Sequence, residues 1–322
     1  MKRTMEKRPT GTRELKDRLK AASRDRLYRF VLKSGQARGA LVSGAYLIQK
    51  MRRRHHLGIL ETLVLGHAYL GSLLMAASMK GDERVTLQID CAGPIKGLVV
   101  EANARLEVRG YLKRVPIPID RPLEDFNLAP FFGAGLLRVT RELQDARQPF
   151  SGTVDLKHGN LAEDLTYYFL SSEQVHSAFN LSVQFDRQGQ VIGAGGLFLQ
   201  RMPNCGESMA GDMERIMPTL PPLGRSLAEG RAPQALITDA FAALQPAIKD
   251  SRRVDFFCPC SRKRFERLLA LLPADDLADL QQSGPFPVEL RCNYCNRVHA
   301  FTQAQMAAIG PNPRSGSSSP AT

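Results

Sequence analysis

The sequence lacks the long apolar segments that mark membrane proteins and secreted precursors. No uninterrupted run of about 18 apolar residues occurs, so we expect no membrane-spanning helix and no membrane partner. The N-terminal segment MKRTMEKRPTGTRELKDRLK has no apolar core of the kind that a secretory signal needs. It also carries Glu6, Glu14 and Asp17, which is atypical of an acidic-poor transit peptide. These absences predict a cytoplasmic protein.

Motifs that would indicate an enzyme are also missing. The histidines show no spacing typical of a hydrolase, and Gly133-Ala134-Gly135 is too short to be a phosphate-binding loop. Cys292 and Cys295 form a C-x-x-C pair like that of thiol oxidoreductases. Such a pair usually begins a helix in a βαβ unit, and no such unit is predicted here. We therefore expect a protein that is not an enzyme, with a thiol oxidoreductase as an open alternative.

Positive charge is in excess, with a formal net charge of +12. Half of it lies in residues 1–26, where ten Lys or Arg and four Asp or Glu leave a net +6. This predicts a basic N-terminal extension over residues 1–25, which we interpret as a solvated arm. An arm that attracts RNA or phosphate is the less favoured alternative.

Hydrophobic periodicity predicts an α+β fold of layered sheets and helices. Residues 57–79 are apolar at helical spacing, which predicts a helix buried on most of its surface, with His67 packed in the core. From residue 84 onward apolar and polar residues alternate, which predicts strands. Strands are predicted at 84–89, 97–101, 105–112, 136–140, 180–186 and 190–200. Helices are predicted at 40–51, 160–169, 233–245 and 262–272, and 27–32 as a strand or short helix.

Residues 206–252 differ in kind from the preceding region. Met209, Met213, Ile216 and Met217 share one helical face, and a Leu-Pro-Pro-Leu-Gly breaker follows. A methionine-rich face provides either adaptable packing or a surface that engages varied partners. The C-terminal residues 303–322, rich in Pro, Gly and Ser from Gly310, are predicted to be a disordered tail.

The cysteines are the most informative residues. In a cytoplasmic chain they should be reduced, so paired spacings indicate metal or redox chemistry before structural disulfides. Cys258-Pro-Cys260 and Cys292-Asn-Tyr-Cys295 are two close pairs separated by 31 residues. A tetrahedral Zn²⁺ needs four donors converging at about 2.3 Å, and two such knuckles supply them. We expect one Zn²⁺ bound by these four cysteines in the reduced state.

The zinc site is either a passive structural centre or a redox switch. C-x-C is unusual in permanent sites, and each close pair could form a local disulfide once the metal leaves. A module of about 50 residues relies on its metal for roughly 10 kcal/mol or more of folding free energy, so oxidation should unfold it. Seven basic residues lie near the cysteines in sequence and should favour thiolates: Arg252, Arg253, Arg262, Lys263, Arg264, Arg291 and Arg297.

Three further residues have side chains that can bind a metal or react as thiols. Cys91 is expected to be a small core residue, and Cys205 a bystander thiol. His299 could replace a ligand, but four cysteines already complete a tetrahedral site.

These motifs resemble the 33 kDa chaperonin family, the redox-regulated heat-shock holdases of the bacterial cytoplasm. The C-x-C-S and C-x-x-C arrangement of that family is present as residues 258–261 and 292–295. The resemblance extends over about residues 26–302. Further matching blocks lie at residues 38–39, 93–95, 136–140, 152–154, 162–174 and 194–196.

The resemblance implies a domain organisation and a mechanism. It implies an α+β chaperone core over 26–205, a metastable helical linker over 206–252 and a zinc-binding redox-switch domain over 253–302. The reduced, zinc-bound form would be inactive. Oxidation would form the disulfides Cys258–Cys260 and Cys292–Cys295, release zinc and unfold the linker. The oxidised protein would dimerise and bind unfolding client proteins without ATP, with the methionine-rich face as a candidate for client binding.

Two features depart from the family pattern and keep a second function in view. The family usually has an acidic residue near Lys263, and its members are commonly acidic overall. The net charge of +12 and the basic N-terminal arm support a zinc-ribbon nucleic-acid-binding protein as the alternative. It would need exposed basic and aromatic residues, and only Tyr294 lies in a knuckle.

Overall fold

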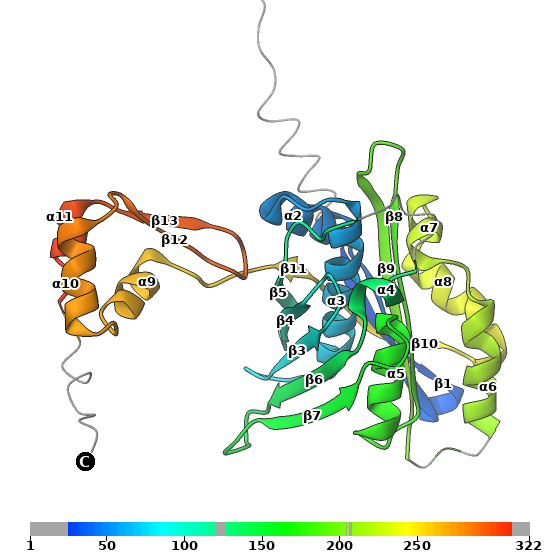
Figure 1. Cartoon of the computed structure of the whole chain (residues 1–322). Helices are drawn as coiled ribbons and strands as arrows, with labels where there is room; N and C mark the ends of the chain where they lie inside the picture. The colour runs from blue at the N-terminus through cyan, green and yellow to red at the C-terminus, as the bar shows by residue number, and fades with distance from the viewer. Residues whose placement is uncertain (1–24, 120–126, 204, 206–207, 311–322) are drawn as a thin grey trace, which may run out of the picture. The chain divides into compact units, whose positions relative to one another are not determined.

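The computed structural model describes residues 25–119, 127–203, 205 and 208–310 (Figure 1). The predicted N-terminal arm, apart from Asp25, and the tail beyond residue 310 lie outside the described residues. The chain divides into two compact units, residues 1–257 and 258–322, which are described separately. The fold is α+β, as the periodicity predicts.

The first unit contains a five-stranded antiparallel sheet, sheet A, with the order β10-β1-β2-β9-β8. Its strands are β1 (Arg26–Leu32), β2 (Ala37–Ser43), β8 (Ser177–Phe185), β9 (Val191–Arg201) and β10 (Ala247–Arg253). A 3-10 turn, η1 (Lys33–Gly35), joins β1 to β2. The predicted helix over 40–51 is wrong in its first part, because residues 40–43 pair with both β1 and β9. The helix there, α2 (Ala45–His55), begins only after Gly44.

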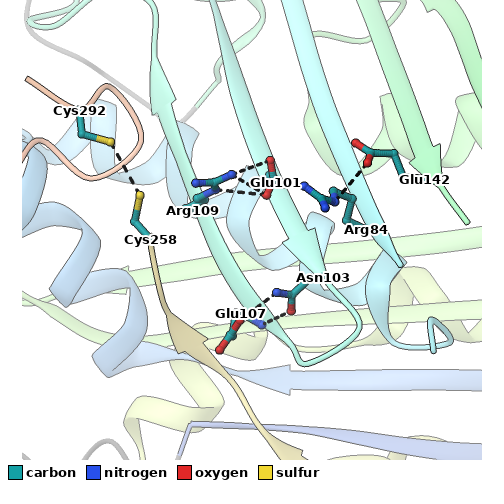
Figure 2. Close-up of polar contacts among 8 residues, drawn as sticks. All are labelled: Arg84, Glu101, Asn103, Glu107, Arg109, Glu142, Cys258 and Cys292. Atoms are coloured by element: carbon teal, nitrogen blue, oxygen red, sulfur yellow. Dashed lines mark hydrogen bonds and ion pairs between the residues drawn. The ribbon is translucent and has the colours of Figure 1, made fainter. Parts of the chain in front are cut away.

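A six-stranded sheet, sheet B, has the order β11-β5-β4-β3-β6-β7. Its strands are β3 (Arg84–Cys91), β4 (Gly97–Asn103), β5 (Glu107–Leu112), β6 (Gly135–Glu142), β7 (Phe150–Asp155) and β11 (Asp255–Phe256). A short helix, α4 (Ala129–Phe132), precedes β6. Cross-strand pairs support the sheet: Arg109 bonds Glu101 at 2.8 Å, and Arg84 contacts Glu142 at 3.3 Å (Figure 2). The alternation predicted from residue 84 onward is confirmed.

Helix α3 (Ile59–Ala76) lies between the two sheets, where it contacts β3, β4 and β5 on one side and β2, β8 and β9 on the other (Figure 1). Among the described residues it is long and apolar enough to cross a membrane, with a mean hydropathy of 1.5. Its apolar sequence is interrupted by Glu61, Thr62, His67 and Ser72. Of this segment, 89% is buried inside the structure. Burial also lowers the pKa of His67 on this helix to about 4.

Helix α5 (Leu161–Ser171) packs beside α3 and against β8. Its N-cap is Asn160, whose side chain accepts a hydrogen bond from Ala162 N at 3.0 Å.

The linker region covers the face of sheet A that points away from α3 (Figure 1). Its elements are α6 (Ser208–Ile216), η2 (Met217–Thr219), α7 (Leu223–Ala228), α8 (Pro233–Ala240) and η3 (Ala242–Leu244). They bury apolar side chains against alternate residues of β1, namely Tyr28, Phe30 and Leu32. The predicted helix over 233–245 ends at Ala240, and the region finishes as strand β10 rather than as helix.

The second unit is small. It contains α9 (Arg262–Leu269), α10 (Ala274–Ser283), β12 (Val288–Arg291), β13 (Val298–Phe301) and α11 (Gln303–Ala307). Strands β12 and β13 form an antiparallel hairpin. Its core consists of five buried residues, Leu269, Leu277, Val288, Phe301 and Met306. Residues 303–307 were expected in the disordered tail, but Thr302 caps them with a capping box and Met306 is fully buried.

Asp25 connects α2 to Val254, between β10 and β11. Its carboxylate accepts hydrogen bonds from Leu47 N at 2.6 Å and Tyr46 N at 3.4 Å, and its carbonyl accepts one from Val254 N at 3.2 Å. The residue is 3% exposed. Burial raises the pKa of Asp25 to about 7, although the hydrogen bonds from Leu47 and Tyr46 act in the opposite direction.

This raised pKa predicts a pH dependence of stability. Between about pH 4 and pH 7 the folded chain holds a proton on Asp25 that the unfolded chain has lost, so the free energy of unfolding falls as the pH rises. The slope approaches about 1.4 kcal/mol per pH unit. Urea unfolding of the wild type and Asp25→Asn at several pH values above about 5.5 measures it. The wild type should lose stability relative to the variant up to about pH 7, and parallel curves would contradict this. Asp82→Asn, at an exposed carboxylate, is the control.

Candidate metal centre

The two cysteine pairs lie in two turns of the second unit. Cys258 and Cys260 precede α9, where the Ser261 side chain caps the helix by accepting a hydrogen bond from Arg264 N at 3.3 Å. Cys292 follows β12, and its carbonyl accepts hydrogen bonds from Cys295 N at 3.3 Å and Asn296 N at 2.7 Å. Asn296 has a φ of 58°, which completes this tight turn into β13.

The four sulfur atoms converge. All lie within 4.8 Å of one another. The Sγ atoms of Cys258 and Cys292 are 3.7 Å apart (Figure 2), and those of Cys260 and Cys295 are 3.3 Å apart. Four sulfurs at about 2.3 Å from a tetrahedral ion would be about 3.8 Å from one another. This group of cysteines could therefore hold a metal ion, and its donor set suits a soft or borderline cation.

Without a cation, burial and contact among the four cysteines favour protonated thiols over thiolates. Burial is the main cause that raises the pKa of Cys260 to about 11, with further contributions from Cys295 and Cys258. The hydrogen bond with Cys258, followed by burial, raises the pKa of Cys292. A cation at the centre reverses this preference, because a coordinating thiol is deprotonated. Without a cation the group favours neutral thiols, and with one it favours thiolates.

Basic residues close to the cysteines in sequence support the two turns. The leading contributions to the pKa of Cys260 and of Cys292 come from burial and from the other cysteines, so the expectation that nearby Arg and Lys favour thiolates stays a prediction. Arg262 instead donates to Ala300 O at 2.7 Å and lies over the Phe301 ring, which fastens α9 to the hairpin. Arg291 donates to Asn296 Oδ1 at 3.0 Å. These side chains support the turns.

The comparisons with known proteins agree with the geometry. Residues 25–302 match the family model described as Hsp33 protein. The chain belongs to the 33 kDa chaperonin family. The "33 kDa chaperonin" of Desulforamulus reducens is 31% identical over 287 residues, which cover 88% of this chain and 97% of the relative. That of Geobacillus sp. is 30% identical with the same coverage.

A solved structure supports the fold. The crystal structure of the 33 kDa chaperonin from Thermotoga maritima has a TM-score of 0.80 and 29% sequence identity, and covers 89% of this chain and 97% of that one. Membership of the 33 kDa chaperonin family, together with the α+β layers and the clustered cysteines, makes this a chaperone-family protein whose C-terminal unit could bind a metal.

Other sulfur and imidazole groups of this family member stand apart from the metal group. Cys91 ends β3 and is partly exposed, so it is not the core residue expected, and its partial burial raises its pKa. The Cys205 sulfur accepts a hydrogen bond from Arg201 Nε at 2.9 Å and packs against the linker cluster. His299 packs its ring against Phe265, with the centroids 4.7 Å apart, and is not a member of the sulfur group.

The methionine-rich face packs against sheet A. Met209 is fully buried and Met213 nearly so, while Ile216 and Met217 lie at the edge of the same cluster. The sequence did not predict the surface of sheet A that the methionine-rich face covers. The buried residues of sheet A in that cluster are Tyr28, Phe30, Leu32, Ala37, Leu41, Leu197 and Leu199. Residues 28, 30 and 32 are apolar at strand spacing, but residues 27 and 31 are apolar as well, so β1 carries no clear signal for this face.

Proposed function

We propose that this chain is a redox-regulated, ATP-independent holdase. In this proposal the reduced, zinc-bound form is inactive, and oxidation of four cysteines exposes a surface that binds unfolding proteins and prevents their aggregation. The observation that carries the proposal is the convergence of four sulfurs beside a small apolar cluster, which has five buried residues in the described part of the unit, in a member of the 33 kDa chaperonin family. The proposed parts are the chaperone core 26–205, the linker 206–252 and the switch domain 253–302.

Cys258, Cys260, Cys292 and Cys295 would hold one Zn²⁺. When bound, the ion supplies the positive charge that keeps four thiolates together. The chain itself contributes the two turns, fixed by the Ser261 cap and by the hydrogen bonds to Cys292 O. A reducing compartment such as the cytoplasm, the proposed location, keeps these thiols available.

Peroxide would convert each pair of thiolates into a disulfide: two thiolates give up two electrons to one H₂O₂, which takes up two protons from solvent and leaves as two waters, and the Zn²⁺ is released. In the folded unit, sulfurs of opposite pairs also lie close together: Cys258 and Cys292 are 3.7 Å apart, and Cys260 and Cys295 are 3.3 Å apart. Once the unit unfolds, closing the short loops Cys258–Cys260 and Cys292–Cys295 costs far less entropy than closing loops of more than thirty residues. We therefore propose the local pairing, which peptide mapping distinguishes from the crossed one.

Unfolding of the switch domain would loosen the linker. Its helices α6, α7 and α8 have six to nine residues each, which is too short for stability in isolation, so they rely on their packing against sheet A. Their departure would uncover the apolar face of β1, β2 and β9. An exposed apolar surface of this kind suits unfolded client proteins and a second oxidised copy, hence the proposed homodimer.

The decisive experiment measures metal, thiols and chaperone activity on the same sample. Zinc-loaded, reduced protein is treated with peroxide and mild heat. We expect loss of one zinc and of four thiols per chain, and suppression of the aggregation of a denatured client only after treatment. A double variant, Cys91→Ser with Cys205→Ser, should behave as the wild type. Zinc retention during activation, or zinc release without any suppression, would contradict the proposal.

The zinc-ribbon nucleic-acid-binding function has one observation in its favour. Helix α9 carries four exposed basic residues, Arg262, Lys263, Arg264 and Arg267. A salt-dependent gel shift of RNA by the reduced protein would support that function, which needs no oxidation.

A further inference from the structure

A cavity of about 320 Å³ opens on the side of sheet A that faces α3. It lies at the C-terminal end of that helix, where Leu74, Ala77 and Ser78 contribute to its wall. The opposite face of the sheet carries the linker cluster, so this cavity is separate from the proposed client surface. Its volume falls in the range of small-molecule sites.

The strand register explains why the sheet is hollow here. One cross-strand row on this face runs from Arg29 through Ala40 to Phe198, and the next runs from Val31 through Arg38 to Gln200. Ala40 thus lies between two large side chains, and its methyl group leaves the space between them unfilled. Ala77, at the end of the facing helix, also has a small side chain and does not fill this space.

The cavity combines apolar walls with cationic residues. Leu74, Val31 and Phe198 provide apolar surface, while Arg29, Arg38 and Lys249 also line it. Arg29 is neutralised, because it forms a forked ion pair with Asp250. Asp250 offsets the charge of Arg29, so Arg38 and Lys249 give the lining a net positive charge.

Arg38 is oriented without being neutralised. Its Nε donates to Gln200 Oε1 at 2.7 Å, and Gln200 Nε2 donates in turn to Ser177 Oγ at 3.2 Å. Gln200 is 6% exposed, so this support is fixed in place. Within the described part of the chain, no carboxylate pairs with Arg38. Partial burial and the nearby Arg141 lower the pKa of Arg38, as expected for a guanidinium that lacks an anion.

We propose that this cavity binds a small amphipathic anion, with its carboxylate or phosphate head on Arg38 and its alkyl tail against Phe198 and Leu74. A guanidinium whose Nη groups remain available binds such heads through paired charge-assisted hydrogen bonds. Burial of the tail in the hollow above Ala40 adds the hydrophobic contribution. The site is independent of the redox proposal and is expected in the reduced, zinc-loaded protein.

Binding is testable by fluorescence with a dansyl-labelled fatty acid as the probe. The chain has no tryptophan, so the dansyl signal has no indole background. We expect saturation at one probe per reduced, zinc-loaded chain, and competition by decanoate or decyl phosphate. Decanol and decyltrimethylammonium should compete at least about 10-fold more weakly, because neither can form the charge-assisted hydrogen bonds to Arg38. The comparison of the two anions identifies the preferred head group.

Two kinds of variant test the charge of Arg38 and the space above Ala40 separately. Arg38→Met should weaken probe binding by about 10-fold or more, Arg38→Lys should retain most of it, and Arg187→Met, at an exposed turn, should leave it unchanged. Ala40→Leu should remove binding by filling the hollow, and unchanged thermal unfolding verifies that this variant folds. Equal competition by the cationic amphiphile, or unchanged affinity in Arg38→Met, would overturn the proposal whatever Ala40→Leu does.

Discussion

Replacing Cys292 with serine is expected to abolish zinc binding and to unfold residues 258–310 while the proposed chaperone core, which ends at residue 205, stays folded. A serine hydroxyl is a poor ligand for Zn²⁺, and three thiolates would remain in a buried group without a fourth donor. The five-residue apolar core cannot sustain a unit of this size alone. Loss of the metal removes roughly 10 kcal/mol, which exceeds any stability that this core supplies.

Two measurements verify this expectation. Zinc content should fall from one equivalent to near zero, and hydrogen exchange should lose protection in α9 to α11 but not in α3. Cys205→Ser is the matched control, because that sulfur lies outside the metal group. A Cys292→Ser protein whose C-terminal unit keeps its protected amides would show that the module folds without its metal.

Phe241→Ala is expected to produce a chaperone that is active while still reduced. Phe241 is 1% exposed at the end of α8, and its ring stacks on Phe30 of β1 with the centroids 5.6 Å apart. Removal of a buried phenylalanine costs about 3–5 kcal/mol. Because the linker helices are short, that loss should detach them from sheet A rather than unfold the whole first unit.

The readout is suppression of client aggregation under reducing conditions with zinc still bound. Phe132→Ala removes a ring of similar burial from α4, remote from the linker cluster, and controls for general destabilisation. If the two variants gave equal activity, exposure of the linker-covered face would not be the cause. An inactive Phe241→Ala protein with a released linker would contradict the proposed client surface.

The sequence predicted the elements that bury one face in a regular pattern. Strands β3, β4, β5 and β6 alternate apolar and polar residues, and α3 is apolar on nearly its whole surface, so each carries its own signal. The four cysteines were also identifiable from spacing alone. Their convergence within 4.8 Å agrees with the predicted metal group.

Other elements depend on partners remote in sequence. Strand β10 reads Ala-Ile-Lys-Asp-Ser-Arg-Arg and lacks alternation, because it gains its order from pairing with β1 more than two hundred residues away. The two-residue strand β11 pairs in parallel with β5, and two residues are too few to show a hydrophobic periodicity. The error at 40–51 has a local cause: the apolar residues of β2 run directly into α2, and only Gly44 separates them.

The position of β10 has a consequence for oxidised protein. This strand closes one edge of sheet A, where it pairs with β1 from Arg26 to Val31. If the linker departs as far as its last strand, the backbone amides and carbonyls of β1 on that side lose their partners. An open strand edge templates the addition of another extended chain. A client could then be held by main-chain pairing, which requires no particular client sequence.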